Sequence, residues 1–136
     1  MNHPVNFEIH VDEISFKNNN IASGTFNVSP AITRSTGVNE SGKYYTKVVV
    51  EILNSSDAPF PVDIRVSMTG LFDLNDMPED KRIDFLSYTG FDVIYPYIRS
   101  TITSLSTNAM LPPIIIPIVD SHQVFQETLK RRQSLN

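Results

Sequence analysis

The chain lacks cysteine, has more acidic than basic residues and contains no long hydrophobic run. Without cysteine there is no disulfide framework, no thiolate nucleophile and no Cys-based zinc site. The 11 basic and 15 acidic residues give a net charge of −4, which argues against binding to a phosphate backbone. No apolar run approaches the roughly 20 residues that span a bilayer, and the first residues do not resemble a secretory signal. These absences predict a cytoplasmic protein with no nucleic-acid partner and no membrane insertion.

Residues that could carry chemistry are scattered along the chain. His3, His10 and His122 are far apart and show no metal-ligand spacing. There is no nucleophile elbow, no P-loop and no dinucleotide-binding glycine motif. The acidic stretch Asp73–Asp80 has neither the ligand order nor the glycine of a calcium-binding loop, so we interpret it as the approach to a helix. The sequence therefore predicts no enzyme, no catalytic residue, no metal and no cofactor.

Alternating apolar and polar residues predict four antiparallel strands between about residues 5 and 72. The first strand contains Phe7–Val11 and continues beyond a bulge near Asp12–Glu13, because the apolar positions change parity there. A turn follows at Asn18–Asn20. The buried faces of the next three strands are predicted at Ala22, Gly24, Phe26 and Val28; at Tyr44, Thr46, Val48, Val50 and Ile52; and at Val62, Ile64, Val66 and Met68. Residues 30–42 are polar and are predicted to form a loop.

Helical signals dominate the second half of the chain. A short helix is predicted over residues 78–85, and Tyr88–Gly90 is expected to end it. A long helix follows over about residues 91–107, with a kink or restart at Pro96. Asp120 is a good N-cap for a last helix that runs to about Arg132. These elements predict one α+β domain, residues 1–136, in which a four-stranded antiparallel sheet carries a long kinked helix and a C-terminal helix on one side.

The long helix has an apolar stripe that needs a partner surface. Apolar side chains recur at steps of three and four residues, at Phe91, Ile94, Tyr95, Ile98, Ile102 and Leu105. Val93, Tyr97 and Thr101 widen this arc over much of the helix surface. A helix with so broad an apolar arc is typical of one that contacts a second subunit as well as its own sheet.

Four phrases of the sequence, in order, resemble the SecB family of bacterial export chaperones. They are Glu13–Lys17 (EISFK), Thr69–Phe72 (TGLF), Tyr95–Ser100 (YPYIRS) and Leu111–Asp120 (LPPIIIPIVD). The resemblance covers nearly the whole chain. It implies a non-enzymatic holdase that works without ATP, holds unfolded or precursor polypeptides in apolar grooves, and assembles as a tetramer formed by two dimers.

The resemblance also implies roles for individual residues. Polypeptide clients would be bound by residues of the connector, the short helix and the start of the long helix: Leu71, Phe72, Phe85, Leu86, Tyr88, Phe91 and Tyr95. Helix packing and oligomer assembly would involve Val62, Ile64, Val66, Met68, Ile98, Ile102 and Leu105.

In the family, acidic side chains on the outer sheet face meet the translocase motor SecA. Glu13 preserves one acid, whereas Lys17 and Arg65 replace others, and Lys130–Arg132 stand where an acidic tail is usual. Such charge reversal weakens the attraction, so SecA is a doubtful partner. Three alternatives to a general export chaperone remain: a SecB-like chaperone dedicated to one client such as an antitoxin, a module that binds a small apolar ligand, and an adaptor for one folded partner.

Overall fold

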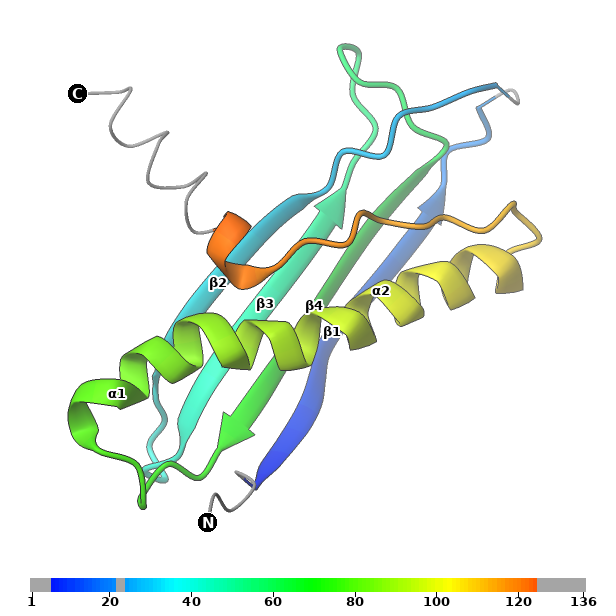
Figure 1. The fold of residues 1–136 in the computed structure, drawn as a ribbon. Coiled ribbons are helices and arrows are strands. Elements are labelled where there is room, and N and C mark those ends of the chain that lie inside the picture. Colours follow the sequence, from blue (N-terminus) through cyan, green and yellow to red (C-terminus); the bar gives the residue numbers. More distant parts are fainter. Residues whose placement is uncertain (1–5, 22–23, 125–136) are drawn as a thin grey trace.

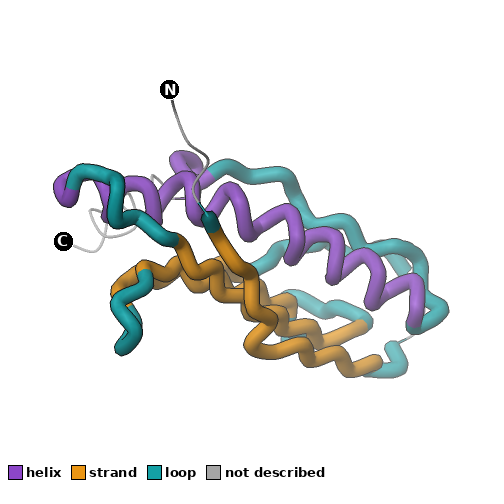
Figure 2. The backbone as a smooth tube through the Cα atoms, turned by 90° about the horizontal axis from the view of Figure 1, so that it is seen from below, coloured by secondary structure: helices purple, strands orange, loops and turns teal. Residues whose placement is uncertain are grey.

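The computed structural model describes residues 6–21 and 24–124. Its centre is an antiparallel sheet with the strand order β1-β4-β3-β2 (Figure 1). The strands are β1 (Phe7–Asn18), β2 (Ala31–Val38), β3 (Tyr44–Ile52) and β4 (Val62–Phe72). Viewed along the layers, the helical segment lies on one face of the sheet, and no helix among the described residues covers the other face (Figure 2). The structure therefore has the predicted α+β architecture of a four-stranded sheet under a long helix.

Two irregularities at β1 agree with the sequence prediction. The pairing of β1 with β4 shifts between Val11 and Glu13, so Asp12 is the extra residue of a bulge. Asn20 adopts a φ of 55° in the turn after the strand, and its backbone N–H donates to the Asn18 side chain at 2.8 Å. Because of the bulge, the apolar residues before and after it face the same side of the sheet.

The predicted position of the second strand was wrong. Residues 24–30 are not part of the sheet, and β2 lies within the segment that was predicted to be a loop. The turn between β2 and β3 explains why residues 31–38, and not residues 24–30, form the strand. In this turn, Gly42 N–H donates to the Asn39 carbonyl at 3.0 Å, and Gly42 has a φ of 79°. A tight turn pairs the residues next to it, so β2 joins β3 despite its polar composition. That composition suits an edge strand with one face in solvent.

The helical part is continuous. It consists of α1 (Glu79–Asp84), a π-helical turn η1 (Phe85–Thr89) and α2 (Gly90–Asn108). The predicted break at Tyr88–Gly90 was therefore wrong, and α2 runs through Pro96 as one helix instead of restarting there.

Contacts from the sheet account for the π turn. Gly90 N–H donates to the Phe85 carbonyl, five residues back, which is the hydrogen bond of a π-helical turn. The Thr46 hydroxyl donates to the Leu86 carbonyl at 2.7 Å, and the Arg34 guanidinium donates to the Ser87 carbonyl. The helix widens at the point where side chains of β2 and β3 donate to its carbonyls.

The buried side chains form two clusters. The larger lies between the sheet and α2 and includes Val48, Val50, Ile64, Phe91 and Ile98. The smaller consists of Phe72, Leu74 and Leu86, with Tyr44, Met77 and Phe85 packed against it. Within the described residues, no helix is long and apolar enough to cross a membrane.

The last helix begins where the sequence predicted. Residues 121–124 are helical, and Gln123 N–H donates to the Asp120 carboxylate at 2.8 Å, as expected for an N-cap. The predicted continuation to Arg132 lies outside the described residues.

Candidate binding groove

An apolar groove lies at the end of the sheet where β4 begins. It encloses about 480 Å³ and is half open to solvent. One wall is the segment before β2, the other is the segment after α2, and Phe60 and Pro61 lie between them. The lining residues are Ile21, Gly24, Phe26, Val28, Phe60, Pro61, Leu111, Pro112, Pro113, Ile114 and Ile115.

The second wall belongs to an extended segment, residues 111–120, which we call the strap. Figure 1 shows it running beside α2 over the covered face of the sheet. Two prolines near its start forbid helix, so the chain leaves α2 in extended form. Met110, whose φ is 63°, lies in the turn between α2 and the strap. In this turn, Leu111 N–H donates to the Ser106 carbonyl at 3.0 Å. This bond closes the end of α2.

Side chains from one face of α2 hold the backbone of the strap. Tyr95 donates to the Pro117 carbonyl at 2.7 Å, Arg99 to the Ile116 carbonyl at 3.2 Å, and Thr103 to the Ile114 carbonyl at 2.8 Å. The Ser106 hydroxyl accepts from Ile114 N–H at 2.9 Å. The α2 residues are spaced by four, four and three, which places them on one side of the helix. Burial raises the pKa of Tyr95, so its hydroxyl stays protonated and able to donate.

This ladder fixes which strap side chains point inward. Ile114 and Ile116 enter the main core, whereas Ile115, between them, is 66% exposed and lines the groove. Successive residues of an extended chain point to opposite sides, so burying two alternate isoleucines forces the middle one outward. The groove thus presents Ile115 to solvent, and its lining also includes Phe60 and Ile114 of the main core.

A second cavity, the end pocket, lies at the opposite end of β4. It encloses about 360 Å³ between the start of β1, the β2–β3 turn and the residues after β4. Leu71 and Phe72, two of the predicted client-binding residues, line it. Phe85 packs edge-on against Phe72 with ring centroids 5.3 Å apart.

The other predicted client-binding residues lie under or along the helix. Phe91 and Tyr95 are buried in the main core, and Leu86 is buried in the smaller cluster. Tyr88 is partly buried and stacks on His122 at 4.2 Å. Of the seven predicted residues, Phe72, Leu86, Phe91 and Tyr95 present almost no surface in this structure, while Leu71, Phe85 and Tyr88 are partly exposed.

The residues predicted to act in helix packing and assembly lie together. Six of them are buried in the main core cluster, and Leu105 packs against it. The β4 members face α2 and the α2 members face the sheet, so within this chain they join helix to sheet. Any role in joining subunits stays a prediction.

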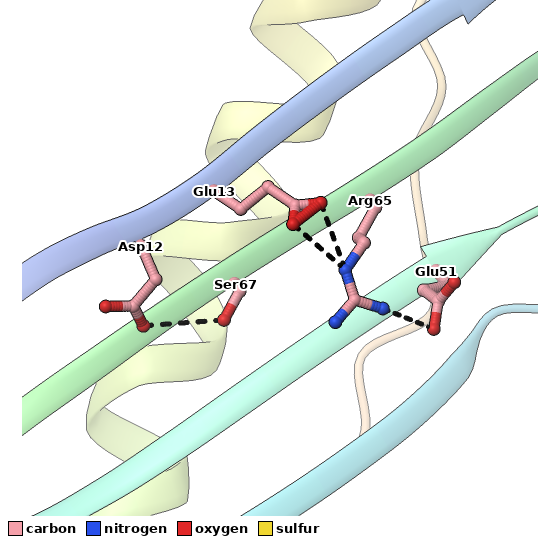
Figure 3. Close-up of polar contacts among 5 residues, drawn as sticks. All are labelled: Asp12, Glu13, Glu51, Arg65 and Ser67. Atoms are coloured by element: carbon pink, nitrogen blue, oxygen red, sulfur yellow. Dashed lines mark hydrogen bonds and ion pairs between the residues drawn. The ribbon is translucent and has the colours of Figure 1, made fainter.

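Glu13 lies on the outer face of the sheet, opposite the helix, and is paired with Arg65 (Figure 3). The Nε of Arg65 is 3.1 Å from its carboxylate, and the Nη1 of Arg65 is 2.7 Å from the Glu51 carboxylate. Beside this trio, Asp12 accepts from the Thr69 hydroxyl at 2.6 Å and from the Ser67 hydroxyl at 3.4 Å. Arg65 therefore partly neutralises the acids that a basic partner would need.

The groove was not predicted from the sequence, because the residues of its two walls were interpreted in other ways. Phe26 and Val28 alternate like a strand and were assigned to the sheet interior. The strap entered the sequence reasoning only as one of the four phrases that resemble the SecB family. Three consecutive isoleucines in an extended segment were the available signal, since at least one of them must face outward.

Comparisons with known proteins agree with this architecture. The described fold resembles the Mycobacterium tuberculosis Rv1957 SecB-like chaperone, solved with a ChAD peptide from the HigA1 antitoxin. The TM-score is 0.65 with 16% identity, over 86% of this chain and 90% of that chain. The fold is therefore SecB-like.

Sequence comparison places the chain in a family. A profile for SecB, the preprotein translocase subunit, matches residues 4–132, so the chain belongs to the SecB family, whose members are non-enzymatic chaperones. The protein-export protein SecB of Methylobacillus flagellatus is 24% identical over 80% of this chain and 69% of its own length. Protein MJ0357 of Methanocaldococcus jannaschii is 29% identical over 60% of this chain. The matched part covers 54% of the length of that relative.

Proposed function

We propose that this protein is an ATP-independent holdase that binds unfolded or precursor polypeptides in the groove beside the strap. The observation that carries the proposal is the apolar groove, with the exposed Ile115 on one wall and the partly buried Phe26 on the other. An unfolded segment exposes apolar side chains, and the groove offers them a matching surface without reactive groups. Binding would follow buried apolar area, at about 25 cal/mol per Å² before ordering costs, so its sequence selectivity is low.

A matched pair of substitutions tests the groove. Ile115→Asp places a charge in it, and Ile83→Asp makes the same change on α1, at a site 55% exposed and outside the groove lining. Both variants are mixed with a chemically denatured model protein during dilution, without nucleotide, and light scattering follows aggregation. We expect the parent protein and Ile83→Asp to suppress aggregation and Ile115→Asp to lose most of this activity.

Failure of the parent protein at several-fold excess would contradict the holdase proposal. Equal loss in both variants would place binding elsewhere. If the parent protein instead retains a lipid-like molecule in native mass spectrometry and leaves aggregation unchanged, the module for a small apolar ligand is the better description.

We further propose a homo-oligomer, a tetramer formed by two dimers. Phe7, Val11 and Ile14 on β1 are 46%, 54% and 47% exposed, although they pair with buried β4 residues on the helix-covered side of the sheet. Among the described residues β1 is an end strand of the sheet, so one edge of its backbone has no neighbouring strand there. A second copy of the protein that packs along β1 would cover these three side chains and would pair with the strand edge. Light scattering after size exclusion measures the mass, and Val11→Asp should lower it to that of a smaller species.

The client and the route are also proposals. The SecB-like relative Rv1957 was solved with an antitoxin peptide, which supports a dedicated chaperone, while the Methylobacillus relative is an export protein. Pairing of Glu13 with Arg65 supports the dedicated role, because the outer face is less acidic than a basic motor surface requires. We place the protein in the cytoplasm and expect weak binding to SecA, measured by interferometry. Tight binding would favour export.

A further inference from the structure

Phe60 joins the two walls of the groove. Its side chain is 4% exposed, belongs to the main core cluster and lines the groove. It packs edge-on against Phe26 of the first wall, with ring centroids 6.2 Å apart. Phe60 lies in the loop that connects β3 to β4, at the same end of the sheet as residues 24–30 (Figure 1). The shape of the groove therefore depends on a residue of this loop.

The loop itself offers Phe60 little support. Phe60 stands between Pro59 and Pro61, which have no N–H, so it carries the only backbone donor of these three residues. Ser55 N–H donates to the Ala58 carbonyl at 3.2 Å, and Ala58 N–H donates to the Ser55 hydroxyl at 3.0 Å. These two bonds close the tip of the loop and do not reach Phe60.

Two asparagine side chains hold the backbone of Phe60, one on each side. The Oδ1 of Asn54, which follows β3, accepts from the Phe60 N–H at 3.0 Å. The Nδ2 of Asn19, which follows β1, donates to the Phe60 carbonyl at 3.4 Å. The Asn19 backbone N–H also donates to the Pro61 carbonyl at 2.9 Å. Both polar backbone groups of Phe60 are thus bound to residues that follow other strands.

One carboxylate oxygen holds both asparagines. The Oδ1 of Asp63 accepts from the Asn54 backbone N–H at 2.7 Å and from the Asn19 Nδ2 at 3.1 Å. These bonds lower the pKa of the Asp63 carboxyl, and the charge of Lys17 acts in the same direction, so the acceptor is ionised at neutral pH. Hydrogen bonds to an ionised acceptor are stronger than those between neutral groups. We call Asn19, Asn54 and Asp63 the clamp.

We propose that the clamp positions Phe60 for client binding, so that Asn54 sets the affinity of the groove without lining it. This inference rests on the proposed holdase function. None of the three clamp residues lines the groove, so each acts through the Phe60 backbone and is a positioning residue. Without Asn54 the Phe60 N–H loses its acceptor, and the ring can leave its place against Phe26. An aliphatic segment in the groove then loses part of its contact area.

Asn54→Ala tests the clamp at a single bond. It removes the acceptor of the Phe60 N–H and keeps the backbone N–H that donates to Asp63. Asn39→Ala is the matched control, because the Asn39 side chain also accepts from a backbone N–H, that of Lys43 at 2.9 Å. Asn39 lies in the β2–β3 turn, at the other end of the sheet. Asn54→Asp keeps an acceptor oxygen and should restore the behaviour of the parent protein.

The first readout is a single tryptophan. The chain has no tryptophan, so Phe26→Trp places the only one beside Phe60 on the groove wall. In this background Asn54→Ala should shift the tryptophan emission to longer wavelength and increase its quenching by acrylamide. Asn39→Ala should change neither. Equal emission and quenching in the two variants would show that Asn54 does not fix Phe60, and would overturn the inference.

The second readout is affinity for a defined probe. The probe is a fluorescently labelled synthetic peptide of about ten residues, in which leucine alternates with serine. Fluorescence anisotropy measures its Kd at a temperature where every variant is folded. Asn54→Ala should raise the Kd about fivefold, corresponding to one lost hydrogen bond. Asn39→Ala should leave the Kd unchanged, and Asn54→Asp should return it to the parent value.

A double-mutant cycle separates positioning from general support of the fold. In a Phe60→Leu background the ring that Asn54 positions is gone, so Asn54→Ala should weaken peptide binding much less than in the parent protein. The same loss in both backgrounds would mean that Asn54 does not act through Phe60, and would overturn the inference.

The peptide experiment also separates this inference from the proposed function. If the peptide binds the parent protein and loses affinity in Ile115→Asp, but binds Asn54→Ala as tightly as the parent, the clamp is refuted and the holdase stands. If the peptide does not bind the parent protein, the groove is not the client site and both proposals fail.

Discussion

Ser121 donates both its backbone N–H and its hydroxyl to the two carboxylate oxygens of Asp92, each at 3.0 Å. Ser121 is fully buried, and Asp92 lies in the first turn of α2. The pair fastens the far end of the strap to the helix that also holds its middle. The groove wall is thus positioned by two segments that are 29 residues apart in the sequence.

Asp92→Ala should lower the free energy of unfolding by about 1–3 kcal/mol, because it leaves the buried Ser121 donors without their charged acceptor. Urea denaturation followed by circular dichroism measures the change. Asp76→Ala removes an exposed acid and should stay within about 0.5 kcal/mol of the parent. Similar values for both variants would show that the Asp92 contact contributes little.

Met110→Gly should raise the free energy of unfolding by about 0.5–1 kcal/mol. Met110 is 91% exposed and adopts a φ of 63°, a conformation that glycine reaches without steric cost. Ala109→Gly, one position earlier with a φ of −87°, should instead destabilise the protein. The same denaturation experiment compares them, and a shift of equal sign in both would count against the argument from backbone conformation.

Gly90→Ala should destabilise the protein by about 1–3 kcal/mol. A methyl group at this position would collide with the Thr46 hydroxyl, which donates to the Leu86 carbonyl. The π turn and the sheet would have to separate. In a Thr46→Ala background the obstructing oxygen is gone, so the cost of Gly90→Ala should be smaller. Additive effects in this double-mutant cycle would contradict the proposed collision.

Asp63 should make stability depend on pH in the acidic range. Hydrogen bonds from Asn54 N–H at 2.7 Å and from the Asn19 side chain at 3.1 Å lower the pKa of its carboxyl. A lowered folded pKa stabilises the protein fully above the unfolded value of about 3.9, and the contribution is lost as pH falls through the folded value.

Asp63→Asn should therefore be less stable than the parent at neutral pH, and the difference should shrink below about pH 4. Thermal unfolding at a series of pH values measures this. Asp57→Asn, in the loop that precedes β4, provides the baseline for removing an acid nearby. A difference that stays constant with pH would contradict the assignment.

Local sequence patterns predicted much of the fold correctly. Alternation in β3 and β4, the bulge at Asp12 and the N-cap at Asp120 each depend on a few neighbouring residues, and each is present. Prediction failed where distant groups compete. β2 was placed in the wrong segment because a tight turn at Gly42 overrode the stronger alternation of residues 22–28.

The site was harder to predict than the fold. The apolar character of the strap is plain in the sequence, but its role as a groove wall depends on the ladder of α2 side chains. Phe72 and Leu86 were predicted to meet a client directly, and the structure buries both. Hydrophobicity alone cannot distinguish a residue that fills the core from one that waits for a partner.

The sequence by itself determined that this is a cysteine-free α+β protein of the SecB family, with a polar outer sheet face and a helix that must be covered. Composition decides the absence of cysteine, and the profile match over residues 4–132 decides the family. Periodicity decides the strand and helix faces, because it acts over a few residues. Only the tertiary structure decided that the helix continues through a π turn, that Arg65 forms an ion pair with Glu13, and that Ile115 faces outward. Each of these depends on which distant donors, charges and side chains the fold brings within contact distance.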